Sequence, residues 1–100
     1  MGQKQPLTNK RFVSISEVEL KALGEVSGEA MRLYVTIASY AWTEDYGCYP
    51  GWAEIEKKMG KKLGARRGRQ LAEQLEQAHL IERFWKPVKG QMKRHFRLLK

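Results

Sequence analysis

The stretch MGKKLGARRGRQ, residues 59–70, has glycines at every fourth position, at 60, 64 and 68. Between residues 57 and 69 the chain carries seven Lys or Arg side chains and no Asp or Glu. Three interpretations compete: a phosphate-binding loop, a disordered basic segment, and the start of a helix that reads DNA. The flanking sequence separates them.

A nucleotide-binding P-loop has the pattern G-x-x-x-x-G-K-[ST] between a strand and a helix. Here the glycines are spaced by four, no Ser or Thr follows a Gly-Lys pair, and a helix is predicted before the stretch. We therefore reject that interpretation. A disordered segment also fits poorly, because Leu63 and Leu71 need burial and an amphipathic helix is predicted on each side. The remaining interpretation is a helix–turn–helix.

Apolar residues at helical spacing predict one helix over 51–59, ended by Gly60, and a second from 64 or 65 to 79. The first has an apolar face of Trp52, Ile55 and Met59. The second has a buried stripe of Leu71, Leu75 and Ala78. Gly68 falls on that stripe, where a missing side chain allows two helices to approach closely.

Two helices are predicted before this pair. One covers 16–23, because Ser16 and Glu19 have capping-box spacing and Gly24 can end the helix. The other covers 27–42 and is apolar on two faces. Its main stripe is Met31, Tyr34, Val35, Ala38, Ala41 and Trp42, and its second face is Leu33, Ile37 and Tyr40.

Strand patterns lie mainly after the helix pair. Residues 80–87 and 92–100 predict a β-hairpin around a turn at 88–91. Residues 11–16 favour a short strand, and 43–51 is typical of a turn or loop. The buried face of the returning strand should carry Phe96 and Leu98.

Length and composition indicate one small α+β domain that is mainly α. We expect a flexible basic arm over 1–10 and a single domain over 11–100. No apolar run approaches the ~18 residues of a spanning helix, and no secretory signal is recognisable. One cysteine and two histidines offer neither a disulfide nor a metal cluster. We therefore expect a cytoplasmic non-enzyme with no cofactor, no metal and no catalytic residues.

The net charge of +8 is strongly segregated. Residues 57–69 and 83–100 each contain seven Lys or Arg and no acid, whereas 14–56 contains eight acids and two bases. Segregation of this kind creates a positive face and suggests a polyanionic partner. A solvated face that binds nothing specific is the alternative.

The second helix of a helix–turn–helix lies in the major groove with its N-terminal residues at base edges. Arg pairs bidentately with guanine and Gln with adenine, and cations nearer the turn suit phosphates. The contacts expected from the second helix are Arg66, Arg67, Arg69 and Gln70. Those expected from the turn are Lys61 and Lys62. Those expected from the hairpin are Lys86, Lys89, Gln91, Lys93 and Arg94.

YGCYPGWAEIEKKMG (46–60) and LAEQLEQAHLIERF (71–84), followed by the basic hairpin, resemble the winged helix–turn–helix domains of phage and plasmid replication proteins and related regulators. The resemblance covers about residues 11–100. It implies a winged helix–turn–helix with a C-terminal β-hairpin wing, bound to double-stranded DNA in transcription control, replication, or maintenance and transfer of a mobile element. The matching positions are Tyr49-Pro50, Ile55, Met59-Gly60, Leu75-Glu76, Leu80-Ile81 and Arg83.

The chain departs from that pattern at several positions. Gly51 stands where Ser usually caps the first helix of the pair, and His79 where Gly usually precedes Leu-Ile. Lys61-Lys62 look like a two-residue lengthening of the turn, and Gly68 stands where a β-branched residue is common. These departures predict a recognition helix that starts late or is tilted.

Other functions stay open. A winged helix can dock a protein, in which case the acidic segment 14–56 with Trp52 and Trp85 would form the working surface. RNA binding is a weaker alternative, because the strands offer aromatic side chains but no RNA-module signature. A monomer, a homodimer, and a protein partner within a replication or transfer complex are all compatible with the sequence, whereas a membrane is not an expected partner.

Overall fold

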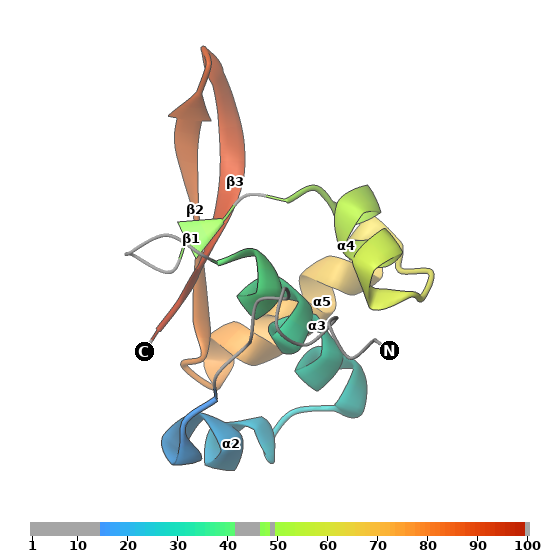
Figure 1. The fold of residues 1–100 in the computed structure, drawn as a ribbon, viewed down its shortest axis with the longest axis vertical. Helices are drawn as coiled ribbons and strands as arrows, with labels where there is room; N and C mark the ends of the chain where they lie inside the picture. The colour runs from blue at the N-terminus through green and yellow to red at the C-terminus, as the bar shows by residue number, and fades with distance from the viewer. Residues whose placement is uncertain (1–14, 42–46, 49, 100) are drawn as a thin grey trace, which may run out of the picture.

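The structure is a computed structural model that describes residues 15–41, 47–48 and 50–99. In this part of the chain, four helices lie in a body from which a β-hairpin projects (Figure 1). The fold is therefore α+β and mainly helical, as predicted. The elements are α2 Glu17–Leu23, α3 Gly28–Tyr40, β1 Gly47–Cys48, α4 Trp52–Met59, α5 Ala65–Gln77, β2 Ile81–Val88 and β3 Gln91–Leu98.

Some predictions fall outside the described residues. These are the arm over 1–10, most of the strand expected over 11–16, and Trp42. None of the helices in the described ranges is long and apolar enough to cross a membrane.

Serine caps fix the starts of α2 and α3 where the sequence predicts them. Ser16 Oγ accepts a hydrogen bond from Glu19 N–H (3.1 Å), and Glu19 Oε1 accepts one from Ser16 N–H (2.8 Å), which completes the capping box. Ser27 Oγ accepts the N–H of Ala30 (3.1 Å). Both helices are confirmed, although α3 ends at Tyr40, before the predicted end at 42.

The buried face of α3 takes residues from both faces that the sequence predicts. Met31 and Val35, members of the main stripe, are 36% and 38% exposed. Leu33 and Ile37 of the second predicted face are fully buried. Tyr34 of the main stripe is buried as well, and Ala38 and Ala41 of that stripe pack against the core. Because α3 is apolar on two sides, its contacts with α4, α5 and β1 select the face.

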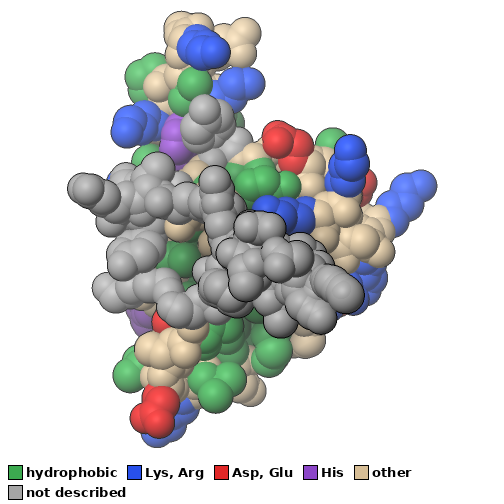
Figure 2. Space-filling model, in the orientation of Figure 1, with side chains coloured by type: hydrophobic (Ala, Val, Ile, Leu, Met, Phe, Trp, Pro, Cys, Tyr) green, Lys and Arg blue, Asp and Glu red, His purple; other side chains and the backbone are tan. Residues whose placement is uncertain are grey.

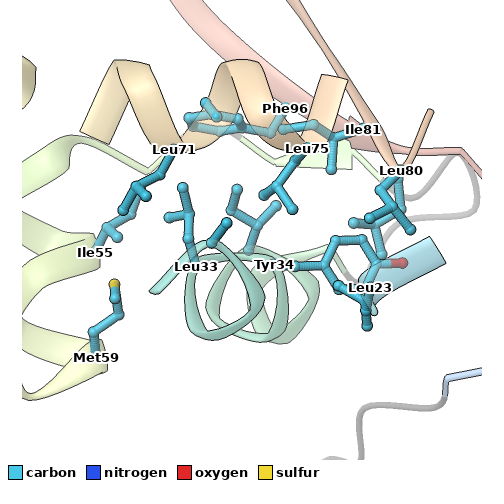
Figure 3. Close-up of a cluster of buried hydrophobic side chains, with 14 of the residues drawn as sticks. Leu23, Leu33, Tyr34, Ile55, Met59, Leu71, Leu75, Leu80, Ile81 and Phe96 are labelled. Carbon is cyan, nitrogen blue, oxygen red and sulfur yellow. The ribbon is translucent and has the colours of Figure 1, made fainter. Parts of the chain in front are cut away.

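The hydrophobic core lies where α3, α4, α5 and the base of the hairpin meet (Figure 3). The predicted stripes of α4 and α5 are confirmed, and the base of β3 contributes buried side chains as expected. Full burial of one such large side chain contributes about 1.5–3 kcal/mol to folding. Members drawn in Figure 3 include Leu33, Ile55, Met59, Leu71, Leu75, Ile81 and Phe96.

α4 and α5 approach each other closely at Gly68. A Cβ atom at this position would lie 2.7 Å from two ring carbons of Trp52, so no larger residue fits without movement. The ring of Trp52 also meets Phe96 edge-on, with 5.8 Å between ring centroids. The close approach predicted at Gly68 is confirmed, and Trp52 belongs to the joint between α4, α5 and β3.

Both helices of this pair end in a left-handed residue. Gly60 follows α4 with a φ of 71°, a conformation that glycine adopts at little cost. His79 follows α5 with a φ of 60°. There Leu80 N–H donates to Leu75 O (2.9 Å) and His79 N–H to Glu76 O (3.0 Å), a Schellman motif. A side chain at such a φ costs about 1 kcal/mol.

The hairpin is confirmed, with a two-residue turn. β2 and β3 pair antiparallel from Ile81 opposite Leu98 to Val88 opposite Gln91. Lys89 and Gly90 join them with φ values of 52° and 82°, the combination of a type I′ turn.

A third strand, β1, pairs antiparallel with β3 and places Cys48 opposite Phe96, so the strand order is β1-β3-β2. The sequence predicted only a turn or loop over 43–51, which is wrong at this point. A strand of two residues is too short to show an alternating pattern.

Candidate nucleic-acid interface

The predicted contact residues lie on three neighbouring segments: the α4–α5 turn, the start of α5, and the hairpin. All of them are exposed except Arg94, which is half-buried. Figure 2 shows Lys and Arg side chains at the far end of the hairpin and along the side that carries α4 and the turn after it. Their surroundings differ, however, because some of these cations pair with an acid of the fold and others do not.

The start of α5 presents Arg66 and Arg69 to solvent, and neither forms an ion pair with a described residue. Its N-cap is Gly64, which has no capping side chain, and no acid lies in the first turn. The first N–H groups and the positive end of the helix dipole are therefore uncompensated by a nearby carboxylate of this helix. Such a helix start favours phosphate groups.

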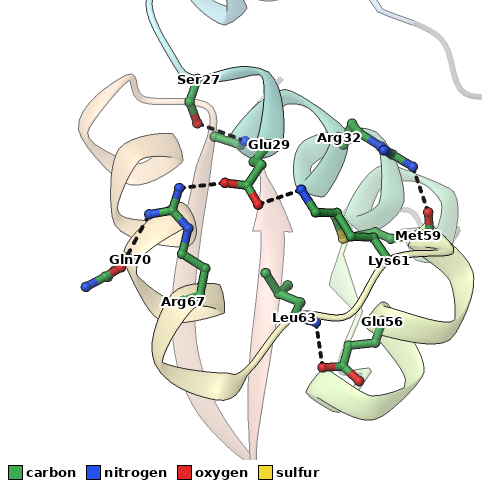
Figure 4. Close-up of polar contacts among 10 residues, drawn as sticks. Ser27, Glu29, Arg32, Glu56, Met59, Lys61, Leu63, Arg67 and Gln70 are labelled. Atoms are coloured by element: carbon green, nitrogen blue, oxygen red, sulfur yellow. Dashed lines mark hydrogen bonds and ion pairs between the residues drawn. The ribbon is translucent and has the colours of Figure 1, made fainter.

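Two of the predicted phosphate contacts are instead held by Glu29 at the start of α3 (Figure 4). Glu29 Oε1 lies 2.6 Å from Arg67 Nη2, and Glu29 Oε2 lies 2.9 Å from Lys61 Nζ. The hydrogen bond from Arg67, followed by that from Lys61, lowers the pKa of Glu29 from 4.5 to about 2. Arg67 also donates to Gln70 Oε1 at 3.4 Å, a weak bond. These cations thus fix α5 and the turn against α3.

The turn over 60–64 is held by two further hydrogen bonds. Glu56 Oε2 accepts the N–H of Leu63 at 2.7 Å, and Arg32 Nη2 donates to the carbonyl of Met59 at 2.8 Å (Figure 4). The leucine side chain is buried in the core. The turn is therefore ordered despite its two added lysines, and Lys62 is left exposed without an ion pair to a described residue.

The register of the hairpin sorts its basic residues onto two faces, because residues directly opposite each other share a face. Trp85 lies opposite Arg94, on the same face as the buried Phe96, which packs towards the helices. Lys86 lies opposite Lys93 on the other face. Lys89 occupies the tip and Gln91 begins β3 beside it.

Arg94 links the hairpin to the start of α4. Its guanidinium carbon lies 5.5 Å from the ring centre of Trp85 and 5.9 Å from that of Trp52, distances typical of cation–π contacts. Burial lowers the pKa of Arg94, and repulsion from Arg83 and Arg69 lowers it further. Arg83 is balanced by Glu76, at 2.7 Å. The two basic blocks therefore lie close enough for Arg69 and Arg94 to repel each other.

The sequence alone did not identify two parts of this site. The pairing of Trp85 with Arg94 could have been found from the Lys89-Gly90 turn, since a two-residue turn fixes the register. The Glu29 ion pairs had no local signal, because their partners are 32 and 38 residues away in the chain.

Two findings concern metal-binding and nucleophilic side chains in the part of the chain that the structure describes. No group of three or more His, Cys, Asp or Glu side chains there is arranged to hold a metal ion. Burial raises the pKa of the Cys48 thiol to about 12, so at neutral pH it is almost entirely protonated.

Comparison of the chain with protein-family models, curated proteins and solved structures found no match. The function is therefore argued from the geometry of the chain itself.

Proposed function

We propose that this protein is a winged helix–turn–helix that binds double-stranded DNA without catalysing a reaction. α4 and α5 would be the helix–turn–helix, with α5 as the recognition helix in the major groove. The β2–β3 hairpin would be the wing, reaching an adjacent groove or the backbone. This assignment agrees with the element order and with the docking geometry of helix–turn–helix proteins.

The observation that carries the proposal is the closeness of Arg69 on α5 to Arg94 on the hairpin. Two blocks of like charge, separated by an acidic segment in the sequence, converge on one side. Burial and then Arg83 of the same block lower the pKa of Arg94, and Arg69 of the first block lowers it further. Such convergence costs stability in the free protein, and a polyanion bound across both segments offsets that repulsion. Phosphates lining a groove have the required charge and spacing.

Two further features of the hairpin also cost stability in the free protein. Lys86 and Lys93 are directly opposite each other, an arrangement in which like charges are destabilising. Lys89 occupies a left-handed position at a cost of about 1 kcal/mol. Strained or repulsive positions are often retained at functional sites. Contact between the wing and phosphates would offset the unfavourable positions of all three lysines.

The residues proposed to act do so in different ways. Arg66 and Arg69 are the candidates for base edges, because they are exposed at the start of α5. Lys62 and the hairpin lysines are the candidates for phosphates. The process would be transcription control, replication, or maintenance and transfer of a mobile element, with a homodimer or a further protein partner as options.

Selection from a pool of random duplexes tests the proposal. The protein is titrated against the labelled pool at about 150 mM salt, and the bound fraction is sequenced. Enrichment of a defined motif supports a sequence-specific DNA reader, and a palindromic motif supports a dimer. Weak, motif-free binding that is lost on modest addition of salt would reduce the basic side to an electrostatic surface and refute the specific function.

A second candidate is a protein-interaction module on the acidic side. On α2, the side chains of Val18 and Leu20 are 79% and 61% exposed. Exposed apolar side chains that lie together can mark a site of protein interaction. Trp52 does not support this alternative, because its ring is packed against Gly68 and Phe96. Replacing Val18 and Leu20 together by Ser should abolish association with a partner if this candidate is correct, and should leave duplex binding unchanged.

A further inference from the structure

A hollow of about 220 Å³ lies between the hairpin and the segment that enters α4. Its walls include Pro50, Gly51 and Trp52 on one side and Trp85, Met92 and Arg94 on the other. Ligand sites for drug-sized molecules occupy ~300–1,000 Å³. The hollow is therefore suited to one flat group rather than to a whole ligand.

The hairpin side of this hollow is apolar and exposed. Trp85 is 61% exposed and Met92 is 58% exposed, although both lie on the face that packs towards the helices nearer the base. Pro87 lies opposite Met92 and adds to the same face. An exposed indole on a strand, next to a thioether, offers a flat surface on which an aromatic ring can stack.

A cation borders the same surface. The guanidinium of Arg94 lies within 6 Å of the ring centres of both Trp52 and Trp85, and it forms no ion pair with a described residue. Its neighbour Arg83 is paired with Glu76, and Arg69 approaches from α5. An aromatic surface beside a positive charge is the arrangement that binds single-stranded nucleic acid, with the base stacked and the phosphate attracted.

We infer that this hollow receives one unpaired nucleobase, stacked on Trp85 with its phosphate beside Arg94. A base in a continuous duplex is stacked between its neighbours and reaches such a hollow only by being extruded, which costs energy. The protein therefore prefers a duplex that continues into single-stranded DNA over a plain duplex. This inference deepens the proposed function and rests on it for the identity of the ligand as DNA.

Fluorescence anisotropy with four labelled DNAs tests the inference. They are a plain duplex, two versions of that duplex with a single-stranded extension of about ten nucleotides at one end or at the other, and the single strand alone. Binding is measured at about 50 mM salt, where binding to any sequence is strongest. We expect one of the extended duplexes to bind about tenfold more tightly than the plain duplex.

Trp85→Ala should abolish that preference and leave affinity for the plain duplex within about twofold. Trp85 is mostly exposed, so the variant should fold. Phe84→Leu is the matched control, because Phe84 is the adjacent aromatic residue but lies on the opposite face, stacked on His95. It should retain the preference.

Equal affinity of the wild type for plain and extended duplexes would overturn the inference and leave duplex binding intact. A preference that survives in Trp85→Ala would overturn it as well. Binding of the single strand alone, lost in Trp85→Ala, would support the inference even if plain duplex binding fails. Failure to bind any of the four DNAs would overturn both the inference and the proposed function.

Discussion

The two basic blocks of the chain look alike in sequence but differ in the structure. In the first, over 57–69, Lys61 and Arg67 are paired with Glu29 and help to hold α5 in place. In the second block, over 83–100, Arg83 and Arg97 near the base of the hairpin are paired with Glu76 and Glu82. Its outer lysines, Lys86, Lys89 and Lys93, form no ion pair with a described residue, and their positions are unfavourable. A charge run can thus be part of the fold in one place and uncompensated in another.

The difference indicates how to separate stability from binding. Cations that the fold itself neutralises should affect unfolding when they are changed, whereas uncompensated cations should affect a polyanionic partner. Arg69 and Arg94, where the blocks meet, should report on the partner most strongly.

Gly68→Leu should have the largest effect, which is a loss in the free energy of unfolding of the protein. The new side chain would collide with the ring of Trp52, and overpacking of this kind costs about 3 kcal/mol. α5 would also be displaced, and Arg69 with it. Urea unfolding measures the loss. Gly28→Ala is the control, because nothing lies within 4 Å of a Cβ there; equal stability of the two variants would contradict the close packing.

Arg69→Ala should weaken binding to a selected duplex by about 1–3 kcal/mol and relax the preference at one base position. Stability should not fall and should rise slightly, because Arg69 pairs with no described acid and its repulsion of Arg94 is removed. Isothermal titration calorimetry measures the affinity.

Arg67→Ala serves as the contrast to Arg69→Ala, since Arg67 is already paired with Glu29. It should lose less affinity and show a detectable change in unfolding. A larger loss of affinity for Arg67→Ala than for Arg69→Ala would reverse the assignment of the two arginines.

Lys89→Gly should change stability and DNA affinity in opposite directions, because it removes both backbone strain and a positive charge. Relief of the positive φ should raise stability by about 1 kcal/mol. Affinity for all duplexes should fall alike, and the slope of log affinity against log salt should become shallower by about 0.9 for the phosphate lost. Thermal unfolding and a salt titration measure the two quantities.

His79→Gly is the matched control for Lys89→Gly. It relieves the same kind of backbone strain at the end of α5, outside both basic blocks. It should raise stability by about 1 kcal/mol and leave DNA affinity unchanged. Unchanged affinity in Lys89→Gly as well would remove the tip from the interface.

Glu29→Gln should have the smallest effect on stability. It should leave Lys61 and Arg67 of the first block without an ion pair to Glu29, as the outer lysines of the hairpin are without one. The folded pKa of Glu29, about 2, lies below its ordinary 4.5. Its contribution to stability is therefore complete above about pH 4.5 and is lost as the pH falls through 2. The variant should lack this dependence. Unfolding followed between pH 2 and 5 measures it.

Loss of that carboxylate should also free Lys61 and Arg67, so DNA binding should become tighter and more dependent on salt. Glu25→Gln removes one negative charge from a residue that pairs with no described cation. A gain in affinity of the same size in that control would mean that net charge alone is responsible.

Local signals predicted most of the fold. Ser16 with Glu19, Ser27, Gly60 and the Lys89-Gly90 turn each act through hydrogen bonds or backbone conformation within a few residues, and each was confirmed. The periodicity of α4 and α5 identified their buried faces, because each helix is apolar on one side only.

Long-range contacts decided what the sequence could not. The sequence predicted a main apolar stripe and a second apolar face on α3, and packing against α4, α5 and β1 buried Leu33 of the second face while leaving Met31 of the main stripe exposed. The pairing of Glu29 with Lys61 and Arg67 depends on the same packing. The sequence therefore predicted the residue types and the segments of the candidate site. It did not predict which of the cations are already paired with an acid of the fold.

The hairpin also has a consequence for the timescale of its motions. Eight residues at ~3.3 Å each make β3 about 26 Å long. Phe96 and Leu98 anchor it in the core, while Met92 is exposed. Because a two-stranded ribbon alone is only marginally stable, its outer half should open locally, and amide hydrogens near Met92 should exchange far sooner than that of Phe96. The slowest and fastest exchange in the sheet would thus occur four residues apart on one strand. A ligand bound at the tip would slow exchange near Met92 and so reduce the difference between the two rates.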